Sequence, residues 1–401
     1  MMRPLSEMRL VVVSHVVHYR FEGRLFAYGP YAREIVLWAE LFGEIAIASP
    51  CRNAAPPADC LAFDADNISL LPQIEAGGET LAAKLALFFT LPAMIARLCR
   101  ALAQADAIHV RCPGNLGLLG VLLAPLFRKP LVAKYAAQWN ASAQEPRSST
   151  LQKWLLRSRW WRGPVTVYGK WPRQPAHVIP FFTSLLGAPQ MERARIAAHT
   201  PRGKRALHTL YTGRLSKSKH VDAVVRAVAA VRAAGHEMTL TVVGEGPERA
   251  ALAALAAELG IAEAVEFTGG LGFEAVIGCL ERADILALIS ETEGWPKSLA
   301  EGMAFGLIAI GSDRGFVPEM LAEGRGLLVG PGDAEGLAKL LLGVAANPAG
   351  YERMRRDAAL WAQRFSLEGL REAIRKLLVE HWTDGAAGNA AETNIVPAVE
   401  K

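Results

Sequence analysis

Short apolar runs alternate with longer helical patterns along this chain, and this alternation constrains the fold more than any other feature of the sequence. The runs are rich in Val, Ile and Leu, as is typical of strands buried on both faces of a parallel sheet. Strands that alternate with helices predict βαβ units and an α/β fold. In the first half we expect strands at Leu10–Val13, Glu44–Ser49, Ala107–Arg111, Leu131–Tyr135 and Val165–Tyr168, and helices at Tyr31–Leu41 and Gly117–Phe127.

The alternation breaks near the middle of the chain. Residues 185–205 hold several glycines and prolines without a strand period, which favours an interdomain linker. After it we expect strands at His208–Tyr211, Thr239–Val243, Ala264–Thr268, Ile285–Leu288, Leu307–Ile310 and Gly326–Leu328. Helices are predicted at Val221–Ala234, Pro247–Leu259, Lys297–Ala304, Asp333–Ala345, Tyr351–Phe365 and Leu367–Trp382.

A chain of 401 residues is long enough for two domains with separate cores. We therefore predict two doubly wound, Rossmann-like α/β domains that face each other across a cleft. The first covers residues 1–184 and the second residues 206–366, and helix 367–382 is expected to pack back on the first. Residues 384–401 are small and polar without a pattern, so we expect a disordered tail.

The charge balance favours anionic partners. The formal net charge is +5 and the sequence pI is about 9.0, which suits a nucleotide diphosphate, an anionic membrane surface or nucleic acid. Nucleic acid is disfavoured as a partner, because no basic stripe other than the stretch Leu151–Arg162 supports it. The five cysteines form no CxxC pair, which predicts free thiols in a reducing compartment. No apolar run reaches the length of a bilayer span, so we expect a cytoplasmic protein or one peripheral to the inner face of a membrane.

Two cations follow the first strand of the second half. Arg214 and Lys219 lie in the loop after Tyr211, at the sheet edge where open α/β sheets bind ligands. A guanidinium binds phosphate oxygens in pairs, and an ammonium acts as a point charge. Ordinary surface cations on a soluble loop are the alternative interpretation.

Two carboxylates flank another strand-to-helix loop. Glu293 precedes Gly294, Trp295 and Pro296, and Glu301 lies eight positions further on, within the predicted helix. Backbone N–H groups at a helix start suit phosphate, and carboxylates suit ribose or sugar hydroxyls. A solvated helix residue is the alternative for Glu301, since 39 acidic residues produce such spacings by chance.

Two glycine-bearing loops complete the pattern. Gly244 lies in a tight turn after Thr239–Val243, where glycine permits close backbone approach. Gly315 begins a Gly-x-x-Pro-Glu block that ends at Glu319, where a carboxylate in the first helical turn also suits the helix dipole.

Taken in order, these blocks resemble the nucleotide-binding half of the retaining glycosyltransferases of family 4, which have the GT-B fold. The resemblance covers residues 211–365. It implies a retaining transferase of polysaccharide biosynthesis that moves a sugar from a nucleotide-sugar donor to a saccharide or glycolipid acceptor. Arg214 and Lys219 would face the diphosphate, Glu293 the donor sugar and Glu301 the ribose. The remaining expected substrate-binding residues are Gly29, Gly244, Gly294, Trp295, Pro296, Lys297, Ser298 and Leu299. The family generally needs no metal, so we expect neither a metal nor a cofactor.

The first half departs from the family pattern. Members often carry a Gly-Gly pair before the first helix, and here only Gly29 matches. Members often place a His after the strand Leu131–Tyr135, where this chain has Tyr135-Ala-Ala-Gln-Trp139. These departures leave two alternatives to a transferase: a nucleotide-sugar epimerase of the same fold, or a non-catalytic protein that binds sugar nucleotides.

Two further stretches have competing interpretations. Asp64 and Asp66 form an Asp-x-Asp pattern in a polar loop, which we interpret as a turn rather than a metal site. The basic, Trp-rich stretch Leu151–Arg162 suits an interfacial helix on anionic lipid, and also a surface helix that buries its Trp face in the first domain.

Overall fold

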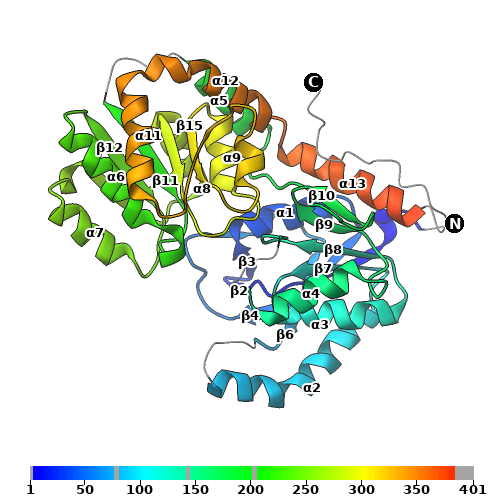
Figure 1. The fold of residues 1–401 in the computed structure, drawn as a ribbon. Coiled ribbons are helices and arrows are strands. Elements are labelled where there is room, and N and C mark those ends of the chain that lie inside the picture. Colours follow the sequence, from blue (N-terminus) through cyan, green and yellow to red (C-terminus); the bar gives the residue numbers. More distant parts are fainter. Residues whose placement is uncertain (1–2, 76–80, 141–144, 201–205, 384–401) are drawn as a thin grey trace. The chain divides into compact units, whose positions relative to one another are not determined.

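The computed structural model describes residues 3–75, 81–140, 145–200 and 206–383 (Figure 1). The chain divides into two compact units, and each is built around a largely parallel sheet. Unit 1 comprises Met1–Phe182 with Gly369–Lys401, and unit 2 comprises Thr183–Glu368. These sheets confirm the α/β class predicted from the alternation of strands and helices. The predicted tail 384–401 lies outside the described residues.

The sheet of unit 1 has ten strands. Its parallel part runs in the order β10, β9, β8, β7, β1, β4, β6, and the order reverses between β1 and β7. These strands are β1 (Arg9–Val13), β4 (Glu44–Arg52), β6 (Ile68–Gln73), β7 (Ala107–Cys112), β8 (Leu131–Tyr135), β9 (Val165–Tyr168) and β10 (Val178–Phe181). A small antiparallel extension leaves the end of β4 and consists of β2 (His18–Phe21), β3 (Arg24–Tyr28) and β5 (Cys60–Ala62).

Helices cover both faces of this sheet. Three helices pack their inner residues into one core with alternate residues of β1, β4 and β7, so they form one layer: α2 (Leu81–Ala103), α3 (Asn115–Leu123) and α4 (Arg147–Arg157). The α1 helix (Gly29–Ala39) lies on the other face, where its Trp38 stacks on His109 with ring centroids 4.3 Å apart. Successive residues of a strand point to opposite faces of the sheet. His109 therefore faces α1, whereas its neighbours Ile108 and Val110 face α2, α3 and α4.

The sheet of unit 2 is parallel throughout, in the order β13-β12-β11-β14-β15-β16. Its strands are β11 (Leu207–Thr212), β12 (Met238–Val243), β13 (Val265–Gly269), β14 (Ile285–Leu288), β15 (Ile308–Ser312) and β16 (Leu327–Val329). The order of the strands reverses between β11 and β14. In open α/β sheets the crevice for ligands lies at this switch point, outside the carboxyl ends of the strands.

The helices of unit 2 are α5 (Ala188–His199), α6 (Val221–Ala233), α7 (Arg249–Glu258), α8 (Phe273–Arg282), α9 (Lys297–Ala304), α10 (Val317–Leu321), α11 (Ala334–Ala346) and α12 (Glu352–Ala362). The α9 helix starts directly after Pro296, as predicted, because proline is compatible with a helix start. It stops before Gly306, whose φ of +68° is the left-handed conformation that commonly ends helices.

The interpretation of residues 185–205 as a linker was incomplete. Residues 188–199 form α5, which belongs to unit 2 and buries Met191, Ala194 and Ala198. Alanines form most of this buried face, so its apolar period is too weak to recognise in the sequence. Residues 201–205 lie outside the described part of the chain.

The last helix, α13 (Leu367–Thr383), continues into unit 1. The indole N–H of Trp382 donates to the carbonyl oxygen of Leu131 at 3.1 Å, and its ring lies edge-on to Phe42. The guanidinium of Arg371 lies 2.7 Å from a carboxylate oxygen of Glu40. Within the described ranges, no helix is both long and apolar enough to cross a bilayer.

Candidate functional site

The switch point of unit 2 brings together two of the loops singled out from the sequence. Arg214 and Lys219 follow β11, and Glu293 follows β14. The backbone N–H of Glu291 donates to the carbonyl oxygen of Ser218 at 2.9 Å, so the two loops are joined by their main chains. The carboxyl ends of adjacent parallel strands meet at one sheet edge, which is why residues far apart in sequence become neighbours here.

An ion pair links the side chains of these loops. The ammonium of Lys219 lies 2.6 Å from a carboxylate oxygen of Glu293. The Glu293 side chain is only 11% exposed and that of Lys219 26%, so the pair is partly shielded from water. Arg214 is exposed at the same edge. One carboxylate and two cations therefore lie at the expected ligand edge.

The backbone of the Arg214 loop is held by a buried tyrosine. The hydroxyl of Tyr211 donates to the carbonyl oxygen of Arg214 at 3.0 Å. Burial, and secondarily the carboxylate of Glu293, raises the pKa of Tyr211 above its usual range, so the hydroxyl keeps its proton and remains a donor.

Three glycines let the loops at this edge pack backbone to backbone. A Cβ added to Gly315, whose φ is +58°, would lie 1.7 Å from the carbonyl oxygen of Glu293. A Cβ on Gly244 would lie 1.9 Å from the carbonyl oxygen of Gly213, and one on Gly246 would lie 2.1 Å from that of Leu215. No side chain fits at these positions, so glycine sets the position of the loops that carry the charged groups.

The start of α9 offers backbone donors. Its N-cap residue, Pro296, provides no side-chain acceptor for the N–H groups of the first turn, which includes Lys297, Ser298 and Leu299. Gly294 and Trp295 lead into this turn. The Trp295 ring stacks on Phe316 with centroids 5.1 Å apart and lies edge-on to Phe365 at the same distance, so aromatic packing orients the helix start.

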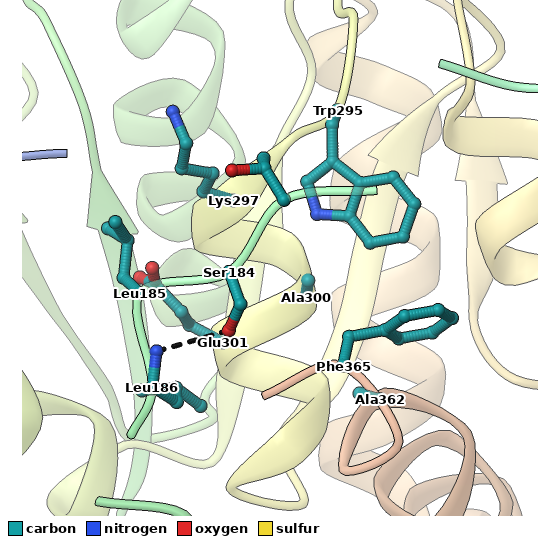
Figure 2. Close-up of a pocket in the computed structure, with 10 residues that line it drawn as sticks. Ser184, Leu185, Leu186, Trp295, Lys297, Ala300, Glu301, Ala362 and Phe365 are labelled. Carbon is teal, nitrogen blue, oxygen red and sulfur yellow. Dashed lines mark hydrogen bonds between the residues drawn. The ribbon is translucent and has the colours of Figure 1, made fainter. Parts of the chain in front are cut away.

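A pocket in unit 2 opens beside α9, and Glu301 lies in its wall (Figure 2). Its lining consists of Thr183, Ser184, Leu185, Leu186, Trp295, Lys297, Ala300, Glu301, Ala362 and Phe365. Glu301 is only 7% exposed. The hydroxyl of Ser184 accepts a hydrogen bond from the N–H of Leu186 at 3.1 Å, which holds the lining segment 184–186 in a turn beside Glu301. A buried carboxylate with carbon walls on several sides suits a ligand that presents hydroxyl groups.

Of the predicted site residues, all but Gly29 lie in unit 2. Trp295, Lys297 and Glu301 line the pocket, whereas Arg214, Lys219 and Glu293 lie on the loops at the switch point. Gly244 packs under the Arg214 loop. Gly29 lies in unit 1 at the first residue of α1, where its N–H donates to the carbonyl oxygen of Asp59 at 2.8 Å.

Two parts of the site were missed in the sequence. The pocket wall formed by residues 183–186 had no motif, and the expected boundary put Thr183 and Ser184 in the first domain. The imidazole of His220 lies 2.8 Å from a carboxylate oxygen of Glu291, which adds a second contact between the two switch-point loops. In the sequence, only the position of His220 directly after Lys219 could have indicated that it belongs to the site.

Unit 1 contains a buried group of charges that the sequence did not reveal. One oxygen of Glu34 lies 2.6 Å from the guanidinium of Arg111, and the other lies 2.7 Å from the ammonium of Lys134. Burial opposes ionisation of Glu34, but the two cations outweigh it and hold its pKa well below the usual range. Each residue lies in an apolar pattern on a different element, so only the fold brings them together.

Two histidines on strands of unit 1, and Tyr135, are buried within the domain. His18 is buried, stacks on Phe63 and lies 2.5 Å from the hydroxyl of Ser49. His109 is buried against Trp38, whereas His15 is exposed. Tyr135 is buried and donates to Glu145 at 3.2 Å. Asp64 and Asp66 lie in the loop between β5 and β6.

The comparisons with known proteins identify the segment that carries this site. Residues 193–361 match the model of a family described as glycosyl transferases group 1. This segment is similar to that family. The match confirms the resemblance drawn from residues 211–365, and the group 1 segment contains all of the expected charged site residues, Arg214, Lys219, Glu293, Lys297 and Glu301.

Curated relatives align with a part of the chain of similar length. A D-inositol 3-phosphate glycosyltransferase of Streptomyces avermitilis is 34% identical over 171 residues, which cover 40% of this chain and 37% of the relative. A glycogen synthase of Mycobacterium tuberculosis is 32% identical over 163 residues, covering 40% of this chain and 39% of the relative. The chain therefore spans less than half the length of these relatives.

Solved structures match a larger part of the chain. The Anabaena protein HepE in complex with UDP and glucose has a TM-score of 0.67 at 15% identity, and the match covers 93% of this chain and 99% of that one. Sucrose-phosphate synthase of Thermosynechococcus elongatus has a TM-score of 0.68 at 20% identity, with the same coverage. At this identity the likeness shows the fold, and it confirms the GT-B class expected from the sequence.

Proposed function

We propose that this protein is a glycosyltransferase that moves a sugar from a nucleotide-sugar donor to a saccharide or glycolipid acceptor. The observation that carries the proposal is the arrangement in unit 2. The ion pair of Lys219 and Glu293 lies at the switch point, and Glu301 lies in the pocket beside α9, all within the group 1 segment. The curated relatives named above are glycosyltransferases, and HepE was solved with UDP and glucose.

The donor would lie along this edge of the sheet. Its diphosphate would contact Arg214, Lys219 and the N–H groups at the start of α9, where cations and a helix start both favour negative charge. Glu301 would accept hydrogen bonds from the ribose, and Glu293 from the donor sugar. As the bond to the diphosphate breaks, negative charge grows on the leaving oxygen, and groups already positioned around it lower the barrier.

Retention of the anomeric configuration is part of the proposal. The acceptor hydroxyl would attack from the side that the diphosphate vacates, so its proton could pass to an oxygen of the leaving group. The two cations supply the positive charge that a divalent metal supplies in other transferases, so we propose a reaction without metal or cofactor.

We also propose a cytoplasmic location. All five cysteines are free thiols, and Cys112 and Cys279 are buried. Free buried thiols are typical of a reducing compartment.

Release of nucleoside diphosphate, measured with and without a saccharide acceptor, tests this function. A transferase should release it rapidly only when the acceptor is present. Release of no diphosphate, with interconversion of the donor into a second nucleotide sugar, would indicate an epimerase. Binding of the donor without either reaction would indicate a non-catalytic protein.

A further inference from the structure

A large apolar surface lies on the outer side of the α2–α3–α4 layer of unit 1. Half of the large apolar side chains that the described residues expose occur in this one stretch of chain: Phe89, Leu122, Leu126, Leu151, Trp154 and Trp160. Phe89 is 77% exposed, Leu126 61% and Trp154 63%. We call this set the apolar face. Clustered exposed apolar residues mark a binding surface, whereas scattered ones do not.

These side chains share one side of the molecule because their helices share one layer. Met94 of α2, Leu116 of α3 and Leu156 of α4 all enter the same core on one face of the sheet. The α3 helix contacts both α2 and α4, so the three outer sides adjoin (Figure 1). The indole N–H of Trp160 donates to the carbonyl oxygen of Val121 at 2.9 Å, which holds the segment after α4 against α3.

Exposed arginines lie on the same helices as the apolar face, or directly after them. They are Arg97 and Arg100 on α2, Arg128 after α3, and Arg157, Arg159 and Arg162 at and beyond the end of α4. Only two acidic residues occur in the sequence from 81 to 162, Asp106 and Glu145. Asp106 accepts from Arg3 and from the N–H of Arg9, and Glu145 lies 2.6 Å from the ammonium of Lys153. The charge around the apolar face is therefore positive.

We propose that the apolar face docks on a membrane surface that contains anionic lipid. Leu and Phe side chains would enter the acyl boundary, Trp rings prefer the interface, and arginines would contact the lipid phosphates. Nucleic acid would pair with the arginines but gives exposed aliphatic side chains such as Leu122, Leu126 and Leu151 nothing to bury against. This docking does not depend on the donor site, which lies in unit 2.

The structure refines which residues should be changed. The guanidinium of Arg157 lies 4.9 Å from the ring centre of Trp139, so replacing it would disturb internal packing. Arg159 and Arg162 are exposed and lie beyond the end of α4, so Arg159→Glu/Arg162→Glu reverses charge without touching a helix. Trp154→Ala removes the largest exposed ring. Leu360→Ala and Arg353→Glu/Arg356→Glu make the same kinds of change on exposed positions of α12 in unit 2.

Co-sedimentation of the full chain with vesicles tests the proposal. The wild type should pellet with vesicles of phosphatidylglycerol and phosphatidylcholine at low salt, and the bound fraction should fall as salt rises. Arg159→Glu/Arg162→Glu should weaken binding by about a hundredfold and Trp154→Ala by about tenfold, whereas both α12 variants should bind as the wild type does. Calorimetric nucleotide binding by each variant checks that the chain is folded. If the protein does not bind a nucleotide-sugar donor at all, vesicle binding should still be as described.

Three results would overturn the proposal. The first is equal pelleting of the wild type and both unit 1 variants, whether all three proteins bind the vesicles or none does. The second is a dimer, detected by light scattering, that Trp154→Ala dissociates, since the face would then bind a second copy. The third is equally strong, salt-sensitive binding of a single-stranded oligonucleotide that displaces the vesicles.

Discussion

The ammonium of Lys219 and a carboxylate oxygen of Glu293 lie 2.6 Å apart, although 74 positions separate the two residues in the chain. The pair joins the loops that follow β11 and β14, the two strands between which the order of the unit 2 sheet reverses. Without a ligand, each side chain neutralises the other. A bound diphosphate would compete for Lys219 and leave the carboxylate of Glu293 for a sugar hydroxyl.

Replacing Lys219 should therefore weaken binding of the phosphates specifically. We expect Lys219→Gln to reduce the affinity for nucleoside diphosphate by about 1.5–3 kcal/mol, the usual contribution of a hydrogen bond to a charged group. Affinity for the matching nucleoside, which has no phosphates, should change little. Calorimetry with both ligands measures the difference, and Lys219→Arg, which keeps the charge, should retain most of the binding. Equal losses for both ligands would contradict a phosphate role.

Glu301 should matter for the nucleoside part of the donor. We expect Glu301→Gln to reduce affinity for the nucleoside and for its diphosphate by a similar amount, about 1.5–3 kcal/mol, because a buried carboxylate accepts stronger hydrogen bonds than an amide. The exposed Glu335 of α11 offers a matched control in Glu335→Gln. An unchanged affinity in a folded Glu301→Gln protein would remove this residue from the site.

Gly315 permits a comparison of two alanine substitutions with similar backbone strain. Gly315 and Gly324 both have left-handed φ values, +58° and +76°. A Cβ at Gly315 would collide with the Glu293 carbonyl, whereas one at Gly324 meets nothing within 4 Å. Gly324→Ala should lose about 1 kcal/mol of stability through backbone strain alone, and Gly315→Ala should lose more because of the collision. Only Gly315→Ala should also reduce donor-dependent turnover, by tenfold or more, because the Glu293 loop must move. Equal turnover in the two variants would show that the contact is unimportant.

His18 should make the stability of the protein depend on pH. Burial lowers the pKa of His18 to about 4, partly offset by the hydrogen bond to the Val16 carbonyl. In the unfolded chain His18 takes up a proton below pH 6.5, the ordinary pKa of histidine. In the folded chain it does so only at about pH 4. The free energy of unfolding should thus fall by about 3 kcal/mol between pH 6.5 and 4 through this residue. Urea unfolding at pH 7 and 4.5 should show a smaller pH effect in His18→Gln, and the same pH effect in both proteins would contradict this.

Activity should survive chelation of metals. We expect EDTA to leave diphosphate release nearly unchanged, because in the proposed function Arg214 and Lys219 would provide the positive charge beside the diphosphate. Loss of activity that manganese restores would contradict this and would direct attention to Asp64 and Asp66.

The sequence by itself determined most strands of the two parallel sheets, and the loops at the switch point of unit 2. The residues of β14 and α9 were predicted to the residue, since a fully apolar run and a proline at a helix start are local signals. The strands β6 and β10 and the helices α2 and α8 had no counterpart among the predicted elements. The small extension of β2, β3 and β5 and the α5 helix were also missed. Their strands are short and half-exposed, and the buried face of α5 is mostly alanine.

Tertiary structure alone decided which side chains meet. The order of chemical groups along the chain indicated a phosphate loop and an acidic loop, but the Lys219–Glu293 pair exists only because β11 and β14 are neighbours in the sheet. Likewise, Glu34 meets Arg111 and Lys134 across three elements, and the apolar face requires α2, α3 and α4 to share one layer. Local patterns specify which elements form, because a period depends on neighbouring residues. Contacts between distant residues depend on how the elements pack, which no local pattern contains.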